Sequence, residues 1–270
     1  RTIGTPMGYE SHLRMPLADW ARVQAALRGV VRDDAGIVAR LRSVKSAAEV
    51  AKITQACAIA GRAFARVPQI ARVGVPLSQV FRDFQRLCLE EGADWVPYLA
   101  GGAAQGGYGD VISPASDAPL VAGDVLMLDT GLVWDGYFCD FDRNFSLGPC
   151  DAQTEAAHAR LIEAVDAAAH IARPGATAAQ LFHAMDAIVT GGKGGSDAGR
   201  LGHGLGMQLT EGLSLIPQDH TVLEPGMVIT LEPGIETGEG RMLVHEEDIL
   251  ITEGAAVFLS PRSGPAMVQL

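Results

Sequence analysis

The chain has 270 residues, of which 48% are hydrophobic and 20% are charged. This composition suffices for one large folded core or two smaller ones, and it excludes a disordered or fibrous chain. The net charge of −11 argues against nucleic acid or anionic membranes as partners, because both require a basic face. No apolar run approaches the roughly 20 residues of a membrane-spanning helix, so the sequence predicts a soluble protein.

The cysteines and the N-terminal residues predict a cytoplasmic protein. The four cysteines form no C-x-x-C pair and sit in apolar stretches, which is typical of reduced thiols. The first residues lack the apolar region of a secretory signal. Because the sequence starts with Arg rather than Met, we expect a fragment or a trimmed chain from which an N-terminal domain is missing.

The first hundred residues predict a linker followed by two helices. Residues 1–40 contain a short strand-like start and an amphipathic segment, and a basic connector follows at 40–45. Ser46 and Glu49 have the spacing of a capping box, which predicts a helix from there to about Val67. A second apolar-periodic segment predicts a helix over 77–91.

The remaining chain predicts strands and a second pair of helices. We expect a strand at 95–99, a glycine-rich loop at 101–110, and a β-hairpin whose strands flank the turn residues Asp135 and Gly136. Two helices follow at about 152–172 and 177–190, and strands are predicted at 205–210, 227–232, 242–252 and 255–259. The order helix–helix–hairpin thus appears twice, which indicates an α+β domain with a mostly antiparallel sheet covered by helices.

Four acidic residues stand inside apolar strand segments, where an unpaired carboxylate is costly to bury. They are Asp129, Asp140, Glu232 and Glu246. Solvated strand ends are the simpler explanation for any one of them, but not for all four. Bound cations would explain the whole set.

The hairpin geometry supports a cation. A fold between Trp134 and Asp135 would place Asp129 opposite Asp140, whereas a turn centred on Asp135 and Gly136 would pair Asp129 with Asp142. In either register two carboxylates face each other, which is unfavourable unless a cation lies between them. An imidazole from His203, which glycines enclose on both sides, would complete a site for Mn, Fe, Co or Zn.

These residues resemble the M24 metallopeptidases, the creatinase, methionine aminopeptidase and prolidase family with the pita-bread fold. The resemblance covers about residues 40–260 and rests on five ordered blocks: KSAAEV, GDVLMLDTG with GYFCDFDR, GHGLG, LEPG and VHEEDILIT. It implies a pita-bread catalytic domain over 41–270. Residues 1–40 would be the tail of a creatinase-type N-terminal domain with its linker.

The resemblance also implies a site with two divalent metal ions and five protein ligands. Asp129 would bind one metal, Asp140 and Glu246 would bridge both, and His203 with Glu232 would hold the other. A metal-bridging water would then attack the substrate, with Glu232 and His203 as the catalytic residues and Glu232 passing protons to the leaving nitrogen. Asp248 is a weaker rival to Glu246 as ligand.

The groups that would bind substrate differ from the family pattern. The peptidases carry a histidine seven residues after the metal-binding one, where this chain has Thr210. They carry another before the first aspartate strand, where residues 100–124 contain no His and offer Tyr108 and Asp110 instead. Asp142 replaces a hydroxyl residue. Tyr108, Thr210 and His220 are the candidate substrate-binding residues, and His245 is expected to be structural.

Three functions compete. The first is a Xaa-Pro dipeptidase or aminopeptidase that acts on a small peptide. The second is a non-peptidic C–N hydrolase, similar to creatinase or ectoine hydrolase, or a lyase on the same fold. The third is an inactive binding module, which the complete ligand set disfavours. The family resemblance suggests a homodimer.

Overall fold

The computed structural model describes residues 1–8, 11–112, 114–195, 199–238 and 240–270. The helices, with one 3-10 turn at Val67–Gln69, are α1 (Leu17–Ala26), α2 (Ile37–Ser43), α3 (Ala47–Phe64), α4 (Leu77–Glu90), α5 (Ala152–Ile171) and α6 (Ala178–Val189). The strands are β1 (Thr2–Thr5), β2 (Val30–Asp33), β3 (Trp95–Gln105), β4 (Asp124–Trp134), β5 (Tyr137–Phe138), β6 (Phe141–Ser146), β7 (Val228–Leu231), β8 (Gly234–Gly238), β9 (Arg241–Val244), β10 (Glu247–Leu250), β11 (Val257–Phe258) and β12 (Val268–Gln269).

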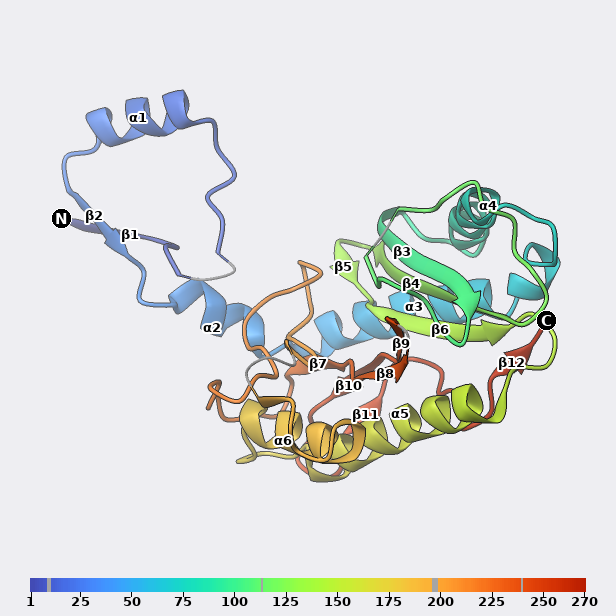
Figure 1. Ribbon diagram of the computed structural model, residues 1–270. Coiled ribbons are helices and arrows are strands. Elements are labelled where there is room, and N and C mark those ends of the chain that lie inside the picture. The colour runs from blue at the N-terminus through green and yellow to red at the C-terminus, as the bar shows by residue number, and fades with distance from the viewer. Residues whose placement is uncertain (9–10, 113, 196–198, 239) are drawn as a thin grey trace.

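The main body has two halves, one with the helices α3 and α4 and the other with α5 and α6, and each helix pair lies beside strands, as the repeated order predicts (Figure 1). α3 packs on β4 and α4 on β3, in a sheet ordered β12-β6-β4-β3, while α5 packs on β7, β8 and β9. Strands within this sheet are antiparallel except β12, which runs parallel to β6. The α+β architecture with mostly antiparallel strands is confirmed.

β4 lies between two hydrophobic cores. Because side chains alternate along a strand, Leu126 and Leu128 join the core built on α3 and α4, whereas Val125 and Met127 join the core built on α5 and α6. Asp129 follows the second set by the same alternation. β4 therefore carries this carboxylate into the interior, on the face directed toward the second half.

Asp135 and Gly136 form the two-residue turn between β4 and β5. Both have positive φ, 46° and 80°, which is the backbone of a type I′ hairpin. The register that follows pairs Asp129 with Asp142. Of the two pairings open from the sequence, the turn selects this one.

The predicted capping box starts α3. Ser46 Oγ accepts the Glu49 amide, and Glu49 Oε2 accepts the Ser46 amide at 2.7 Å. Thr177 and Gln180 make the same reciprocal pair at the start of α6. Each pair satisfies backbone amides that the first helical turn leaves free.

Two predicted segments differ in the structure. β3 continues to Gln105 instead of giving way to a loop, because its glycines permit close contact: a Cβ on Gly101 would lie 2.2 Å from the Met127 carbonyl oxygen. Residues 205–210 form no strand, and the sheet-like contacts nearby are single bridges made by His203 and Gly204.

The elements β1, α1 and β2 lie to one side of the main body (Figure 1). β1 pairs in parallel with β2, and no residue of α1 is buried. α2, which the sequence did not predict, carries Arg42, and both Arg42 and Lys45 form ion pairs with Glu211. A domain boundary at residue 40 stays a prediction. Within the described ranges, no helix has the length and apolarity needed to cross a membrane.

Candidate metal centre

The five predicted ligands come from both halves of the chain, one from within a strand and four from segments next to or between strands. Asp129 lies within β4, and the other four lie outside the strands: Asp140 between β5 and β6, His203 before β7, Glu232 directly after β7, and Glu246 between β9 and β10. The two halves of the fold bring these segments together.

Asp140, His203 and Glu246 form a buried cluster. Each offers one ligand atom, and these atoms lie within 4.8 Å of one another. His203 Nε2 is 3.3 Å from Asp140 Oδ2 and 4.0 Å from Glu246 Oε1. All three residues are at most 3% exposed, so no solvent compensates their charges.

Backbone contacts fix the orientation of His203. Its amide donates to Thr230 Oγ1 at 3.2 Å, and its Nδ1 lies 3.0 Å from the Gly204 carbonyl oxygen. With Nδ1–H donating there, Nε2 carries the lone pair and faces the carboxylates, as a metal-binding imidazole must. Burial lowers the pKa of His203 to about 4, and the charge of Arg200 adds to this effect, so the ring is neutral.

The flanking glycines are required by space. A Cβ on Gly202 would lie 2.2 Å from the Thr230 carbonyl oxygen, and one on Gly204 would lie 2.1 Å from the Glu211 carbonyl oxygen. The loop thus packs directly against β7 and residue 211. This close packing delivers His203 to the cluster.

Asp129 and Glu232 are linked to the cluster by charge. Burial raises the pKa of Asp129 well above its usual value, and Glu232 and Asp142 raise it further. Burial likewise raises the pKa of Glu232 to about 7. Tyr98 donates its hydroxyl to Asp129 Oδ2 at 2.9 Å. Sequence reasoning missed Tyr98, although strand pairing of β3 with β4 could have suggested it.

The donor set fits divalent cations. Burial followed by the neighbouring carboxylates raises the pKa values of Asp140 and Glu246 well above the usual range. One oxygen each of Asp129, Asp140 and Glu246 is buried without a hydrogen-bond partner among the described residues. Hard carboxylate oxygens with one imidazole are a suitable shell for Mn, Fe, Co or Zn. Bound cations would balance the negative charge of these buried carboxylate oxygens.

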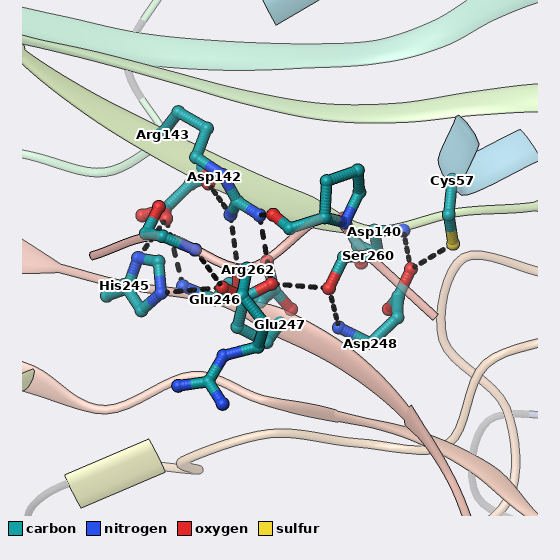
Figure 2. Close-up of polar contacts among 12 residues, drawn as sticks. Cys57, Asp140, Asp142, Arg143, His245, Glu246, Glu247, Asp248, Ser260 and Arg262 are labelled. Atoms are coloured by element: carbon teal, nitrogen blue, oxygen red, sulfur yellow. Dashed lines mark hydrogen bonds and ion pairs between the residues drawn. The ribbon is translucent and has the colours of Figure 1, made fainter. Parts of the chain in front are cut away.

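A polar network lies behind the ligands (Figure 2). His245 Nδ1 is 3.3 Å from Asp142 Oδ1, and His245 Nε2 is 3.1 Å from Glu247 Oε1. Arg143 Nη2 pairs with Glu247 Oε2 at 2.9 Å. Despite burial, Arg143 and His245 hold the pKa of Glu247 at about 2. His245 thus contacts this network, in keeping with the structural role expected for it.

Asp248 stands beside the cluster but outside it. Its Oδ2 accepts the Asp140 amide at 3.0 Å and the Cys57 thiol at 3.2 Å (Figure 2). Burial raises its pKa to about 7. With that oxygen already accepting two donors, Asp248 remains the weaker rival to Glu246.

The three candidate substrate residues lie in different surroundings. Tyr108 is 1% exposed in the core on α5 and α6, where its hydroxyl accepts the Val244 amide at 2.6 Å, so the structure corrects its assignment to substrate binding. Thr210 is half-buried, and its Oγ1 accepts Arg200 Nη2 at 3.1 Å. His220 is exposed and stays a prediction.

Residues 51–253 match the sequence model of metallopeptidase family M24, which is well over half of the chain. The chain belongs to metallopeptidase family M24. It is 32% identical over 246 residues to the probable dipeptidase PepE of Mycobacterium tuberculosis, a match that covers 90% of this chain and 64% of that relative. The chain therefore spans less than two thirds of the length of PepE.

Further proteins are similar to this chain in sequence and in fold. The Xaa-Pro dipeptidase of Pyrococcus horikoshii is 28% identical over 253 residues, covering 93% of this chain and 71% of that one. The crystal structure of the X-Pro aminopeptidase from Thermotoga maritima MSB8 superposes with a TM-score of 0.86 at 27% identity, over 95% of this chain and 72% of that one. These matches confirm the pita-bread fold.

Proposed function

We propose that this M24 chain is a dinuclear-metal-dependent hydrolase of the Xaa-Pro peptidase type, with Asp129, Asp140, His203, Glu232 and Glu246 as the metal ligands. The observation that carries the proposal is the buried cluster of Asp140, His203 and Glu246, whose carboxylate oxygens include two without a partner among the described residues. The relatives named dipeptidase PepE and Xaa-Pro dipeptidase support a peptide substrate.

The protein side chains divide the work. Bound divalent cations would lower the pKa of a shared water molecule and polarise the scissile carbonyl. Glu232 is the residue that we propose passes a proton to the leaving nitrogen. His203 contributes a neutral imidazole with its lone pair directed into the cluster. Mn is our first candidate for the metal, with Co, Fe and Zn as alternatives.

A second candidate function has its own supporting observation. At position 210, where the resemblance expects a substrate-binding histidine, Thr210 pairs with Arg200 instead. Because this pair replaces the histidine of the peptidases while the ligand set is intact, it favours a small nitrogenous substrate that is not a peptide and that is cleaved at a C–N bond. We place the protein in the cytoplasm, which its four free cysteines support, and expect a homodimer, which light scattering in solution would test.

Metal content tests the ligand assignment. We would load the protein with Mn, remove excess ion and measure metal by elemental mass spectrometry for the wild type, Asp140→Asn and Asp135→Asn. Asp135 is the matched control, because it is an exposed aspartate on the same hairpin. We expect about two metal ions in the wild type and the control, and a clear loss in Asp140→Asn. Equal metal in all three would refute the site.

Substrate preference is a separate measurement. The Mn-loaded wild type would be assayed against Xaa-Pro dipeptides, dipeptides without proline, and creatine or ectoine. Selective cleavage of Xaa-Pro bonds supports the first candidate. Cleavage of creatine or ectoine without peptide cleavage would replace it with the second.

A further inference from the structure

Asp140 and Glu246 both lie in two-residue interruptions between strands. Residues 139–140 separate β5 from β6, and residues 245–246 separate β9 from β10. The first amide of each gap still donates to a backbone carbonyl, Cys139 to Leu132 and His245 to Pro233, whereas the amides of Asp140 and Glu246 donate to side chains. The two ligands therefore need another device to hold their backbones in place.

Two aspartates supply that device, each from the opposite segment. Asp142 Oδ1 accepts the Glu246 amide at 2.9 Å, and Asp248 Oδ2 accepts the Asp140 amide at 3.0 Å. Asp142 lies two positions after Asp140 but accepts from Glu246, and Asp248 lies two positions after Glu246 but accepts from Asp140 (Figure 2). The contacts therefore cross between the two segments. Both acceptors are at most 1% exposed.

Arg143 ties the same two segments together. Its Nη1 donates to the carbonyl oxygens of Asp142 and Glu246, the latter at 3.2 Å. Cys57 Sγ donates to Asp248 Oδ2 at 3.2 Å from the α3 side. The crossing contacts are thus anchored on α3 and on β6, and water has no access to compete for them.

We propose that Asp142 and Asp248 form a reciprocal clasp that positions the Glu246 and Asp140 side chains for the metal pair. Fixing an amide nitrogen fixes the adjacent Cα, and so the point from which the carboxylate extends. The clasp acts through backbone amides, so Asp142 and Asp248 are positioning residues and not ligands. The inference rests on the metal centre proposed above.

Matched variants separate the hydrogen bond from the charge. Asp142→Ala and Asp248→Ala remove the acceptor, whereas Asp142→Asn and Asp248→Asn keep an acceptor oxygen and remove the charge. Asp142 Oδ2 and Asp248 Oδ1 have no hydrogen-bond partner among the described residues, so an Asn amino group displaces no donor there. Asp186→Ala is the control, since Asp186 is a buried carboxylate on α6 that accepts the Gly194 amide at 3.2 Å.

Mn²⁺ affinity, measured by competition with a chelator, is the readout. The clasp predicts a loss of about 10- to 100-fold in each Ala variant, as is typical when a group that orients a metal ligand is removed. Both Asn variants should stay within about threefold of the wild type, and Asp186→Ala should bind Mn²⁺ normally.

The outcomes are distinguishable. Wild-type affinity in the Ala variants, or an equal loss in the Asn and Ala variants, would overturn the clasp, the latter because charge or direct ligation would then matter instead of the amide bond. If an Ala variant does not fold, the Asn variants decide: retained affinity supports the clasp and a tenfold loss overturns it. Failure of the wild type to bind Mn²⁺ would refute the proposed function itself.

Discussion

His158 lies on α5 at 2% exposure, and its Nδ1 has no hydrogen-bond partner among the described residues. Burial, with a smaller effect from His245, lowers its pKa to about 4 from an ordinary value of 6.5. Between these values the unfolded chain binds more protons than the folded one. Stability that is present above pH 6.5 is therefore lost as the pH falls toward 4.

We expect His158→Phe to weaken this acid sensitivity. From the two pKa values, the free energy of unfolding of the wild type should fall by about 2 kcal/mol more than that of the variant between pH 7 and pH 5. Urea unfolding at both pH values measures the difference. His170→Phe, at an exposed position on the same helix, should behave as the wild type. Equal pH dependence in His158→Phe and the wild type would contradict the assignment.

Thr210 is the position where one side chain would separate the two candidate substrates. Thr210→His supplies an imidazole and gives up the hydroxyl that accepts Arg200. We expect kcat/KM for a Xaa-Pro dipeptide to rise roughly tenfold or more, because one well-placed donor to the reacting group contributes about 100-fold in other enzymes. Thr210→Leu also removes the hydroxyl that accepts Arg200 but adds no imidazole, and should bring no gain. An equal rise with Leu would attribute the effect to Arg200 instead.

At the scale of elements, the β4–β5 turn sets the register that pairs Asp129 with Asp142. Gly136 has a φ of 80° and open space around its Cα, so a side chain there meets backbone strain but no clash. Gly136→Ala should lower the free energy of unfolding by about 1 kcal/mol in urea titrations. Gly264, which also has open space but no positive φ, gives the control, and Gly264→Ala should change stability little. Equal effects in the two variants would show that the turn backbone carries no such constraint.

Local signals predicted the helices α3 to α6 and the hairpin, but not α2. The Ser46 capping box and the Asp135–Gly136 turn act over a few residues, and both are confirmed. Glycine is ambiguous: Gly101 indicated a loop but serves close strand contact, and the glycines around His203 serve packing as the sequence suggested. Periodicity alone could not distinguish a loop glycine from one that faces another backbone.

The candidate site was predictable as a set of residues but not as an arrangement. An unpaired carboxylate is costly to bury, so acidic residues inside apolar segments could be chosen from the sequence as ligand candidates. The structure places Asp129 within a strand and Asp140, Glu232 and Glu246 just outside strands. The clasp could not, because Asp142 and Glu246 are 104 residues apart and no local pattern states which amide an aspartate accepts. Tyr108 shows the converse error, in which a polar tip in a glycine-rich segment serves the core.

At the scale of the whole molecule, residues 1–36 contribute little to the main body. Of those that the structure describes, Thr5 alone is buried, and the ion pairs to Glu211 start from Arg42 and Lys45, beyond this segment. Deletion of residues 1–36 should therefore change the free energy of unfolding by no more than about 0.5 kcal/mol and leave Mn content unchanged. Urea unfolding and elemental analysis of the shortened chain test this. A large loss of stability would show that the segment covers part of the body.

The order of the ligands along the chain also constrains biosynthesis. A ribosome delivers the hairpin with Asp129, Asp140 and Asp142 long before the segment with Glu246 and Asp248 leaves it. Until then the hairpin carries three carboxylates without the imidazole of His203 and the amide of Glu246 that later lie beside them. The metal centre can thus assemble only late in synthesis, through contacts between residues far apart in the sequence. While only the first half has been synthesised, the chain is most exposed to chaperones and proteases.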